Sequence, residues 1–114
     1  MAKALTAANI IKPYKALFSR GTPELTLGRS LVSASVSHCG SPKKWAQDIK
    51  ANAAALGFVP DQKEATKHVR REVYAQFYRH PSGATILFTE HTGMGYKYVT
   101  RNLDLTVPLA APDA

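Results

Sequence analysis

The stretch VYAQFYRHPSGATILFTEH, residues 73–91, decides the fold class that we expect. Apolar and polar side chains alternate on both sides of the segment His80-Pro81-Ser82-Gly83, and this alternation is typical of β-strands with one buried face. Proline suits the second position of a turn, and glycine supplies the positive φ that a bulged hairpin needs. The stretch therefore predicts two antiparallel strands joined by a tight turn.

These two strands are expected to form one apolar and one polar face. If Arg79 pairs with Ala84, then Phe77 meets Ile86 across the hairpin. The core side then holds the alternate apolar residues Val73, Ala75, Phe77, Ala84, Ile86 and Phe88. The open side presents tyrosines, hydroxyls, an amide and histidines: Tyr74, Gln76, Tyr78, His80, Thr85, Thr89 and His91. Tyrosines can stack on bases, so the open side is a candidate contact surface.

Two helices are expected before the hairpin. Ser41 is a favourable N-cap and Gly57 a favourable C-cap, so a helix is predicted over Ser41–Gly57. Its apolar side chains recur at helical spacing on one side: Trp45, Ile49, Ala53 and Leu56. Asp61 followed by Glu64 fits a capping box that starts a second helix.

Further strands complete the expected sheet. Serines alternate with small apolar residues over 31–38, and a similar alternation follows over Tyr96–Arg101. Leu105 and Val107 add an edge strand. The sequence therefore predicts an α+β fold in which two helices pack on a three- to four-stranded antiparallel sheet. The open edges of such a sheet allow a homodimer.

Length and composition indicate a small basic domain. The chain has 114 residues, of which 45% are hydrophobic, which suits one domain with its own core. We expect an N-terminal arm or extension over residues 1–30, a single domain over 31–108 and a flexible tail over 109–114. Fifteen Lys and Arg against eight Asp and Glu give a formal charge of +7, which favours nucleic acid or an acidic protein as the partner.

Several classes of function are disfavoured by what the sequence lacks. Cys39 is the single cysteine, so no intramolecular disulfide can form, and a cytoplasmic location is expected. Paired Cys and His spacings typical of zinc sites and glycine-rich phosphate loops are missing, so no metal or cofactor is predicted. No apolar run reaches the length of a membrane span, so no membrane partner is predicted.

Nine residues are candidates for binding nucleic acid. Lys43 and Lys44 begin the first expected helix, where exposed backbone N–H groups favour phosphate. A basic stripe on the second helix adds further backbone contacts: Lys63, Lys67, Arg70 and Arg71. Closer contact with the partner is expected from Tyr78, Arg79 and Tyr96. The leading prediction is a small, non-catalytic protein that binds RNA or DNA mainly through its phosphates.

Two other functions stay open. A compact basic chain without catalytic motifs also suits a small inhibitor or adaptor that docks on an acidic surface of a protein partner, such as a nucleic-acid enzyme. A ribonuclease that uses His80 or His91 is the other alternative, because RNA cleavage needs a base and an acid that titrate near neutral pH.

From Pro42 onward, the order of a helix, Leu-Gly-Phe, a spacer and the hairpin resembles the small HicA-type mRNA interferase toxins, whose fold looks like a double-stranded-RNA-binding domain. About half of the chain is covered, and the matching residues are Leu56, Gly57, Phe58, Tyr78, Arg79, His80, Pro81 and Gly83. The family's hallmark is Gly-Ser-His-His just before the tyrosine, where this chain has Val73, Tyr74, Ala75 and Gln76. The resemblance therefore implies an RNA-binding fold that lacks the usual nuclease centre.

Overall fold

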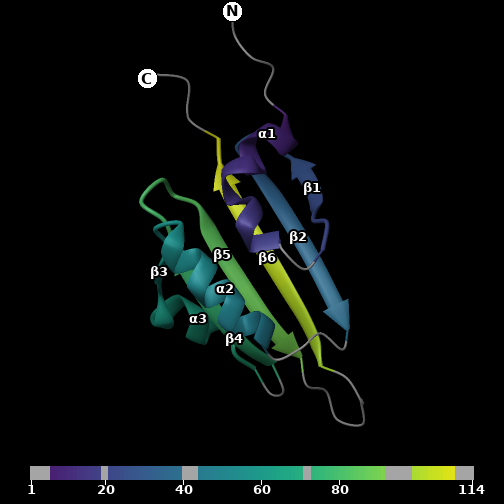
Figure 1. Ribbon diagram of the computed structural model, residues 1–114. Helices are drawn as coiled ribbons and strands as arrows, with labels where there is room; N and C mark the ends of the chain where they lie inside the picture. The colour runs from purple at the N-terminus through teal and green to yellow at the C-terminus, as the bar shows by residue number, and fades with distance from the viewer. Residues whose placement is uncertain (1–5, 19–20, 40–43, 71–72, 92–98, 110–114) are drawn as a thin grey trace, which may run out of the picture.

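The computed structural model describes residues 6–18, 21–39, 44–70, 73–91 and 99–109 (Figure 1). Within these residues, six strands form one antiparallel sheet in the spatial order β1-β2-β6-β5-β4-β3. The strands are β1 (Glu24–Leu27), β2 (Leu31–Cys39), β3 (Val59–Pro60), β4 (Val73–Arg79), β5 (Thr85–His91) and β6 (Thr100–Pro108).

Helical segments cover one face of this sheet. They are α1 (Ala7–Ile11), the 3-10 helix η1 (Lys12–Phe18) and α2 (Lys44–Ala55), whereas α3 (Gln62–His68) packs beside β4 near the β3 edge (Figure 1). We call the face beneath α1, η1 and α2 the helix-covered face and the opposite one the open face. None of the helices in the described ranges is long and apolar enough to cross a membrane.

The fold class is α+β, but the expected two helices on a three- to four-stranded sheet are wrong. The described residues contain three α-helices and six strands. The four-residue β1 and the two-residue β3 are too short for alternation to reveal them. The strand expected at an edge through Leu105 and Val107 is β6, which lies between β2 and β5. The predicted strand over Tyr96–Arg101 falls largely outside the described residues.

The core lies between the sheet and the helices. The longest strands, β2 and β6, place Ala34 beside Leu105, which in turn pairs with Ile86 of β5. From α2, the fully buried Trp45 packs edge-on against Phe88 with ring centroids 5.1 Å apart. Burying aromatic side chains of this size contributes much of the free energy that holds helix and sheet together.

The N-terminal segment expected as an arm joins this core. Ile11 and Leu17 are buried in the same cluster as the sheet residues. In addition, β1 pairs with β2 over four residue pairs, from Glu24↔Ser35 to Leu27↔Val32.

The register of the β4–β5 hairpin differs from the predicted one by a single residue. Arg79 pairs with Thr85 rather than Ala84, so Tyr78 pairs with Ile86. The loop is one residue shorter than expected: the backbone N–H of His80 donates to the carbonyl of Ala84 at 2.9 Å, so the loop consists of residues 81–83 rather than 80–83. A one-residue shift moves every side chain of a strand to the other face. Tyr74, Gln76 and Tyr78 therefore share the helix-covered face, while Val73, Ala75 and Phe77 lie on the open face.

The expected C-cap of α2 is confirmed. Gly57 has φ +95°, and the N–H of Phe58 donates to the carbonyl of Ala53 at 2.9 Å, as in a Schellman motif. The Nε2 atom of His80 lies 3.1 Å from the carbonyl oxygen of Leu56, so the hairpin turn also closes this helix end. The predicted N-cap, Ser41, lies outside the described residues.

The second predicted helix is α3, and its N-cap is also confirmed. An Asp61 carboxylate oxygen accepts from the N–H of Glu64 at 2.9 Å. The helix is shorter than expected, because Val69 is extended and Arg70 already pairs with Val73. Arg70 therefore does not continue the predicted basic stripe along the helix, and Arg71 lies outside the described residues.

Candidate nucleic-acid interface

Positive charge is distributed unevenly over the described part of the chain. Every lysine in it belongs to a helical segment and is exposed: Lys12, Lys15, Lys44, Lys50, Lys63 and Lys67. Arg70, just after α3, is exposed as well. Side chains of the strands point alternately into the core and toward the open face. The lysines that reach solvent therefore lie on the helices.

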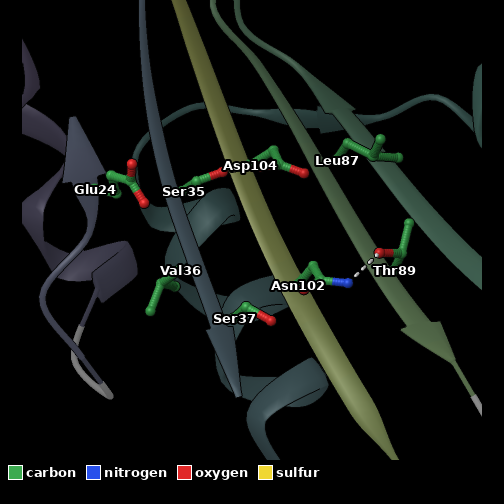
Figure 2. Close-up of a pocket in the computed structure, with 8 residues that line it drawn as sticks. All are labelled: Glu24, Ser35, Val36, Ser37, Leu87, Thr89, Asn102 and Asp104. Atoms are coloured by element: carbon green, nitrogen blue, oxygen red, sulfur yellow. Dashed lines mark hydrogen bonds between the residues drawn. The ribbon is translucent and has the colours of Figure 1, made fainter. Parts of the chain in front are cut away.

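The open face of β1, β2, β5 and β6 has the opposite character. Its described residues include no Lys or Arg and are rich in hydroxyl, amide and carboxylate groups: Glu24, Thr26, Ser33, Ser35, Ser37, Thr85, Thr89, Thr100, Asn102, Asp104 and Thr106. A depression of about 360 Å³ lies on this face, and Figure 2 shows the residues that line it. There Ser35 hydrogen-bonds to Asp104, and the Asn102 amide lies 3.4 Å from the hydroxyl of Thr89.

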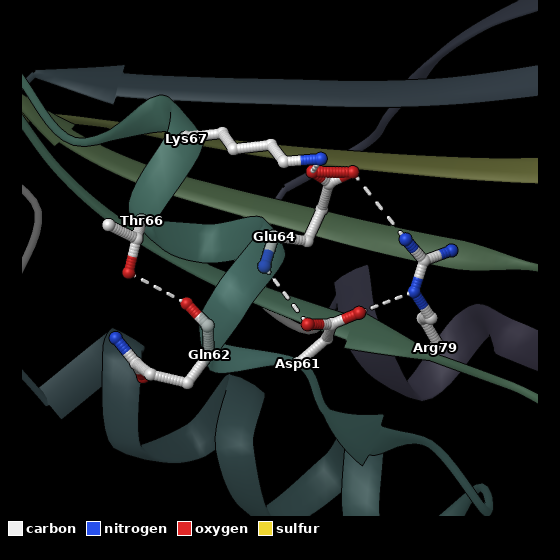
Figure 3. A network of polar contacts seen from close by, with 6 residues as sticks. All are labelled: Asp61, Gln62, Glu64, Thr66, Lys67 and Arg79. Carbon is white, nitrogen blue, oxygen red and sulfur yellow. Dashed lines mark hydrogen bonds and ion pairs between the residues drawn. The ribbon is translucent and has the colours of Figure 1, made fainter.

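Acidic residues neutralise part of the cationic surface at α3 (Figure 3). The guanidinium of Arg79 pairs with Asp61 at 2.6 Å and with Glu64 at 3.5 Å. Glu64 also pairs with Lys67 at 3.3 Å. The hydrogen bond from Arg79, followed by that from the Glu64 N–H, lowers the pKa of Asp61 below its usual value. The side chains of Arg79 and Lys67 thus already form ion pairs within the protein.

Other cations near α2 and α3 are available to a partner. Among the described residues, no carboxylate forms an ion pair with Lys44, Lys50, Lys63 or Arg70. Isolated surface ammonium groups keep their hydration and their charge, so each can neutralise one phosphate of a polyanion. We call these four residues the unpaired cations.

A groove lies between the two helices at the edge of the sheet. It has a volume of about 190 Å³, and we call it the α2–α3 groove. Residues from four elements line it: Lys50 of α2, Pro60 of β3, Gln62 of α3, and Gln76, Phe77 and Tyr78 of β4. The unpaired Lys50 thus stands at the wall of a groove that is otherwise polar and aromatic.

The predicted contact residues fall into four groups. Lys44, Lys63 and Arg70 are exposed and unpaired, whereas Lys67 and Arg79 pair with carboxylates. Tyr78 does not lie on the open face: its ring is 4% exposed, its hydroxyl donates to Gln76 Oε1 at 2.6 Å, and burial raises its pKa. The remaining predictions fall outside the described residues, and these are Lys43, Arg71 and Tyr96.

Sequence reasoning missed the groove itself. Lys50 directly follows Ile49, which belongs to the buried stripe of α2. This position at the edge of the core was the only feature of the sequence that could have marked Lys50 as a site residue. Gln62 and Gln76 belong to different elements that meet only in the fold.

The two candidate catalytic histidines do not come together. His80 precedes β5 and His91 ends it, so roughly 20 Å of strand separates them at about 3.4 Å per residue. The His80 ring is also held, with Nδ1 accepting from the Ser82 N–H at 3.0 Å and Nε2 placed against the Leu56 carbonyl. Within the described ranges, no group of three or more His, Cys, Asp or Glu side chains could hold a metal ion.

Comparison with known proteins adds no family to this picture: no family model, no curated protein and no solved structure matches the chain.

Proposed function

We propose that this protein binds RNA or DNA without reacting on it, mainly through phosphates, and that the unpaired cations around α2 and α3 make the contact. The observation that supports the proposal is the concentration of lysines on the helical segments. All described lysines project from helical segments, while the described open face has neither lysine nor arginine on β1, β2, β5 and β6. A polyanion is attracted to the side where cations are concentrated.

The non-catalytic part of the proposal rests on the histidines. A general acid and a general base must both reach the same phosphodiester, within hydrogen-bond distance of its oxygens. His80 and His91 lie at opposite ends of β5, so they cannot share one phosphate.

Salt dependence tests the proposal. Binding of a labelled oligonucleotide is measured by fluorescence anisotropy over a range of salt concentrations. Each neutralised phosphate contributes about −0.7 to the log–log slope on single strands and about −0.9 on duplex DNA. A slope near zero would contradict phosphate binding.

A pair of charge-matched variants locates the surface. Lys50→Gln, Lys63→Gln and Arg70→Gln together remove three positive charges from the helices. We expect the single-strand slope to fall by about 2 and the affinity at 0.1 M salt to fall roughly 100-fold.

The control variant adds three negative charges at the opposite edge of the sheet instead. Thr26→Glu, Ser30→Glu and Ser37→Glu change the net charge equally, at exposed positions on β1, on β2 and in the turn between them. We expect only a small loss of affinity, because β1 and β2 lie three or more strands from β4. At about 4.8 Å per strand the added charges are more than a Debye length from α3 and are screened. Equal losses in both variants would show that net charge alone drives binding.

The adaptor alternative gives a different result in the same preparation. A protein partner held by the unpaired cations would stay bound after nuclease treatment, and the purified chain would then show little affinity for oligonucleotides.

A further inference from the structure

The α2–α3 groove offers fixed hydrogen-bond donors. The Oε1 atom of Gln76 accepts from the phenol of Tyr78 at 2.6 Å, which orients the amide. Its nitrogen, which carries two N–H donors, makes no hydrogen bond to the described residues. A tyrosine phenol is protonated at neutral pH, and burial raises the pKa of Tyr78 further, so the phenol remains a donor that keeps the amide in this orientation.

The facing wall adds a second amide and a cation. Figure 3 shows the Gln62 amide on the side of α3 that faces away from the Arg79 ion pairs. Across the groove stands Lys50, whose ammonium has no carboxylate partner among the described residues. The groove therefore suits a ligand with several acceptor atoms and a negative charge close by.

The size of the groove limits what can enter. Its volume is about 190 Å³, which suits a small flat group such as one heteroaromatic ring. The exposed surface of Pro60 gives such a ring apolar contact.

From these observations we propose that the α2–α3 groove receives one unpaired nucleobase of a single strand, with the Gln62 and Gln76 amides bonding its edge and Lys50 bonding a flanking phosphate. The proposal rests on the nucleic-acid binding proposed above. An unpaired base exposes the edge that pairing would occupy, and side-chain amides read such edges. In a duplex the edge is taken and the base is stacked, so the groove stays empty.

Three probes of the same length test the proposal with the full chain. They are a labelled oligothymidylate of about 12 nucleotides, within the usual range of single-strand binding sites, the same backbone carrying abasic sites, and a duplex containing the thymidine strand. We expect the base-bearing strand to bind about tenfold more tightly than the abasic strand, since one stacked and bonded base is worth this much or more.

Glutamine variants assign the preference to the groove. Gln62→Ala with Gln76→Ala should abolish the tenfold preference while leaving the salt slope and the affinities for the abasic strand and the duplex unchanged. Gln62→Ala alone, at an exposed helix position, should lower the preference without loss of the far-ultraviolet circular dichroism signal. The matched control is Gln47→Ala, an exposed glutamine on α2 that does not line the groove and should change nothing.

The outcomes separate the two proposals. Equal wild-type affinity for base-bearing and abasic strands would overturn the groove assignment while salt-dependent binding stands. A glutamine variant that weakens all three probes alike, or none of them, would also overturn it. Failure of the wild-type chain to bind any probe at low salt would overturn the nucleic-acid proposal and the groove with it.

Discussion

The two faces of this sheet are built from the same strands and have opposite characters. On β6, Arg101, Leu103, Leu105 and Val107 are buried on the helix-covered face. Their neighbours Thr100, Asn102, Asp104 and Thr106 stand half-buried on the open face. One face is covered by helices whose lysines point into solvent. The other face exposes hydroxyl and carboxylate groups of the strands directly to solvent.

The comparison shows how a basic chain can concentrate its charge. Strands that alternate strictly have no free positions for lysines on the buried side. A helix buries only a stripe and exposes the rest of its circumference, so it can carry a cation such as Lys50 beside the buried Ile49. The lysines are therefore concentrated on the helices, and the described open face of β1, β2, β5 and β6 carries hydroxyls, amides and carboxylates instead.

The largest effect should come from the layer between helix and sheet. Trp45→Ala should lower the free energy of unfolding by about 3–5 kcal/mol, because a fully buried indole that packs on Phe88 leaves a cavity. Thr106→Ala on the open face is the control, with a change of about 0.5 kcal/mol or less. Urea unfolding measures both. Similar losses at the two sites would remove the energetic distinction between the faces.

A smaller loss is expected where the helix-covered side closes at Gly57. Gly57→Ala places a Cβ atom at φ +95° and 3.3 Å from the Nε2 atom of His80. A left-handed alanine costs about 1–2 kcal/mol, so the urea midpoint should fall by a corresponding amount. Unchanged stability would mean that the end of α2 can rearrange freely and does not depend on the hairpin turn.

Alkaline pH should weaken the helix-covered face with a still smaller effect. Burial raises the folded-state pKa of Tyr78 above the value of 10.0 for an unperturbed phenol. The stability contributed by the neutral phenol is therefore complete below pH 10 and is lost as the pH rises through the folded-state pKa. Thermal unfolding from pH 8 to 11 should show a steeper decline for wild type than for Tyr78→Phe. Parallel declines would contradict a buried phenol.

The smallest effect should follow neutralisation of the open face. Glu24→Gln with Asp104→Asn removes two carboxylates, yet nucleic-acid affinity at 0.15 M salt should change by less than about twofold. The change is small because Glu24 on β1 and Asp104 on β6 lie two or more strands from β4 and α3, so salt screens them from the unpaired cations. An increase of tenfold or more, measured by anisotropy, would place the polyanion on the open face.

How far the fold could be predicted varies along the chain. The α2 stripe and both predicted caps that lie in the described residues, Gly57 and Asp61, follow from local rules of spacing and hydrogen bonding. The hairpin was also expected, but its register was not, because the motif does not specify how many residues the turn takes. That single residue decided whether Tyr78 would face a partner or the core.

The candidate site shows the same division. Exposed cations such as Lys44 and Lys63 could be found from the sequence, since a charged residue on a helix surface needs no tertiary information. Which cations remain free could not be found, because Asp61 and Glu64 engage Arg79 from 18 and 15 residues away along the chain. The groove also depends on how α2, α3 and β4 are placed relative to one another.

The sequence by itself determined the α+β class, the caps of the helices and the excess of positive charge, since each follows from residue types and short-range spacing. Only the tertiary structure decided the face to which each side chain of β4 points, the carboxylates that neutralise a cation and the meeting of Lys50, Gln62 and Gln76 in one groove. These depend on strand register and helix packing, and both are selected by burial of the whole core rather than by any local stretch of residues.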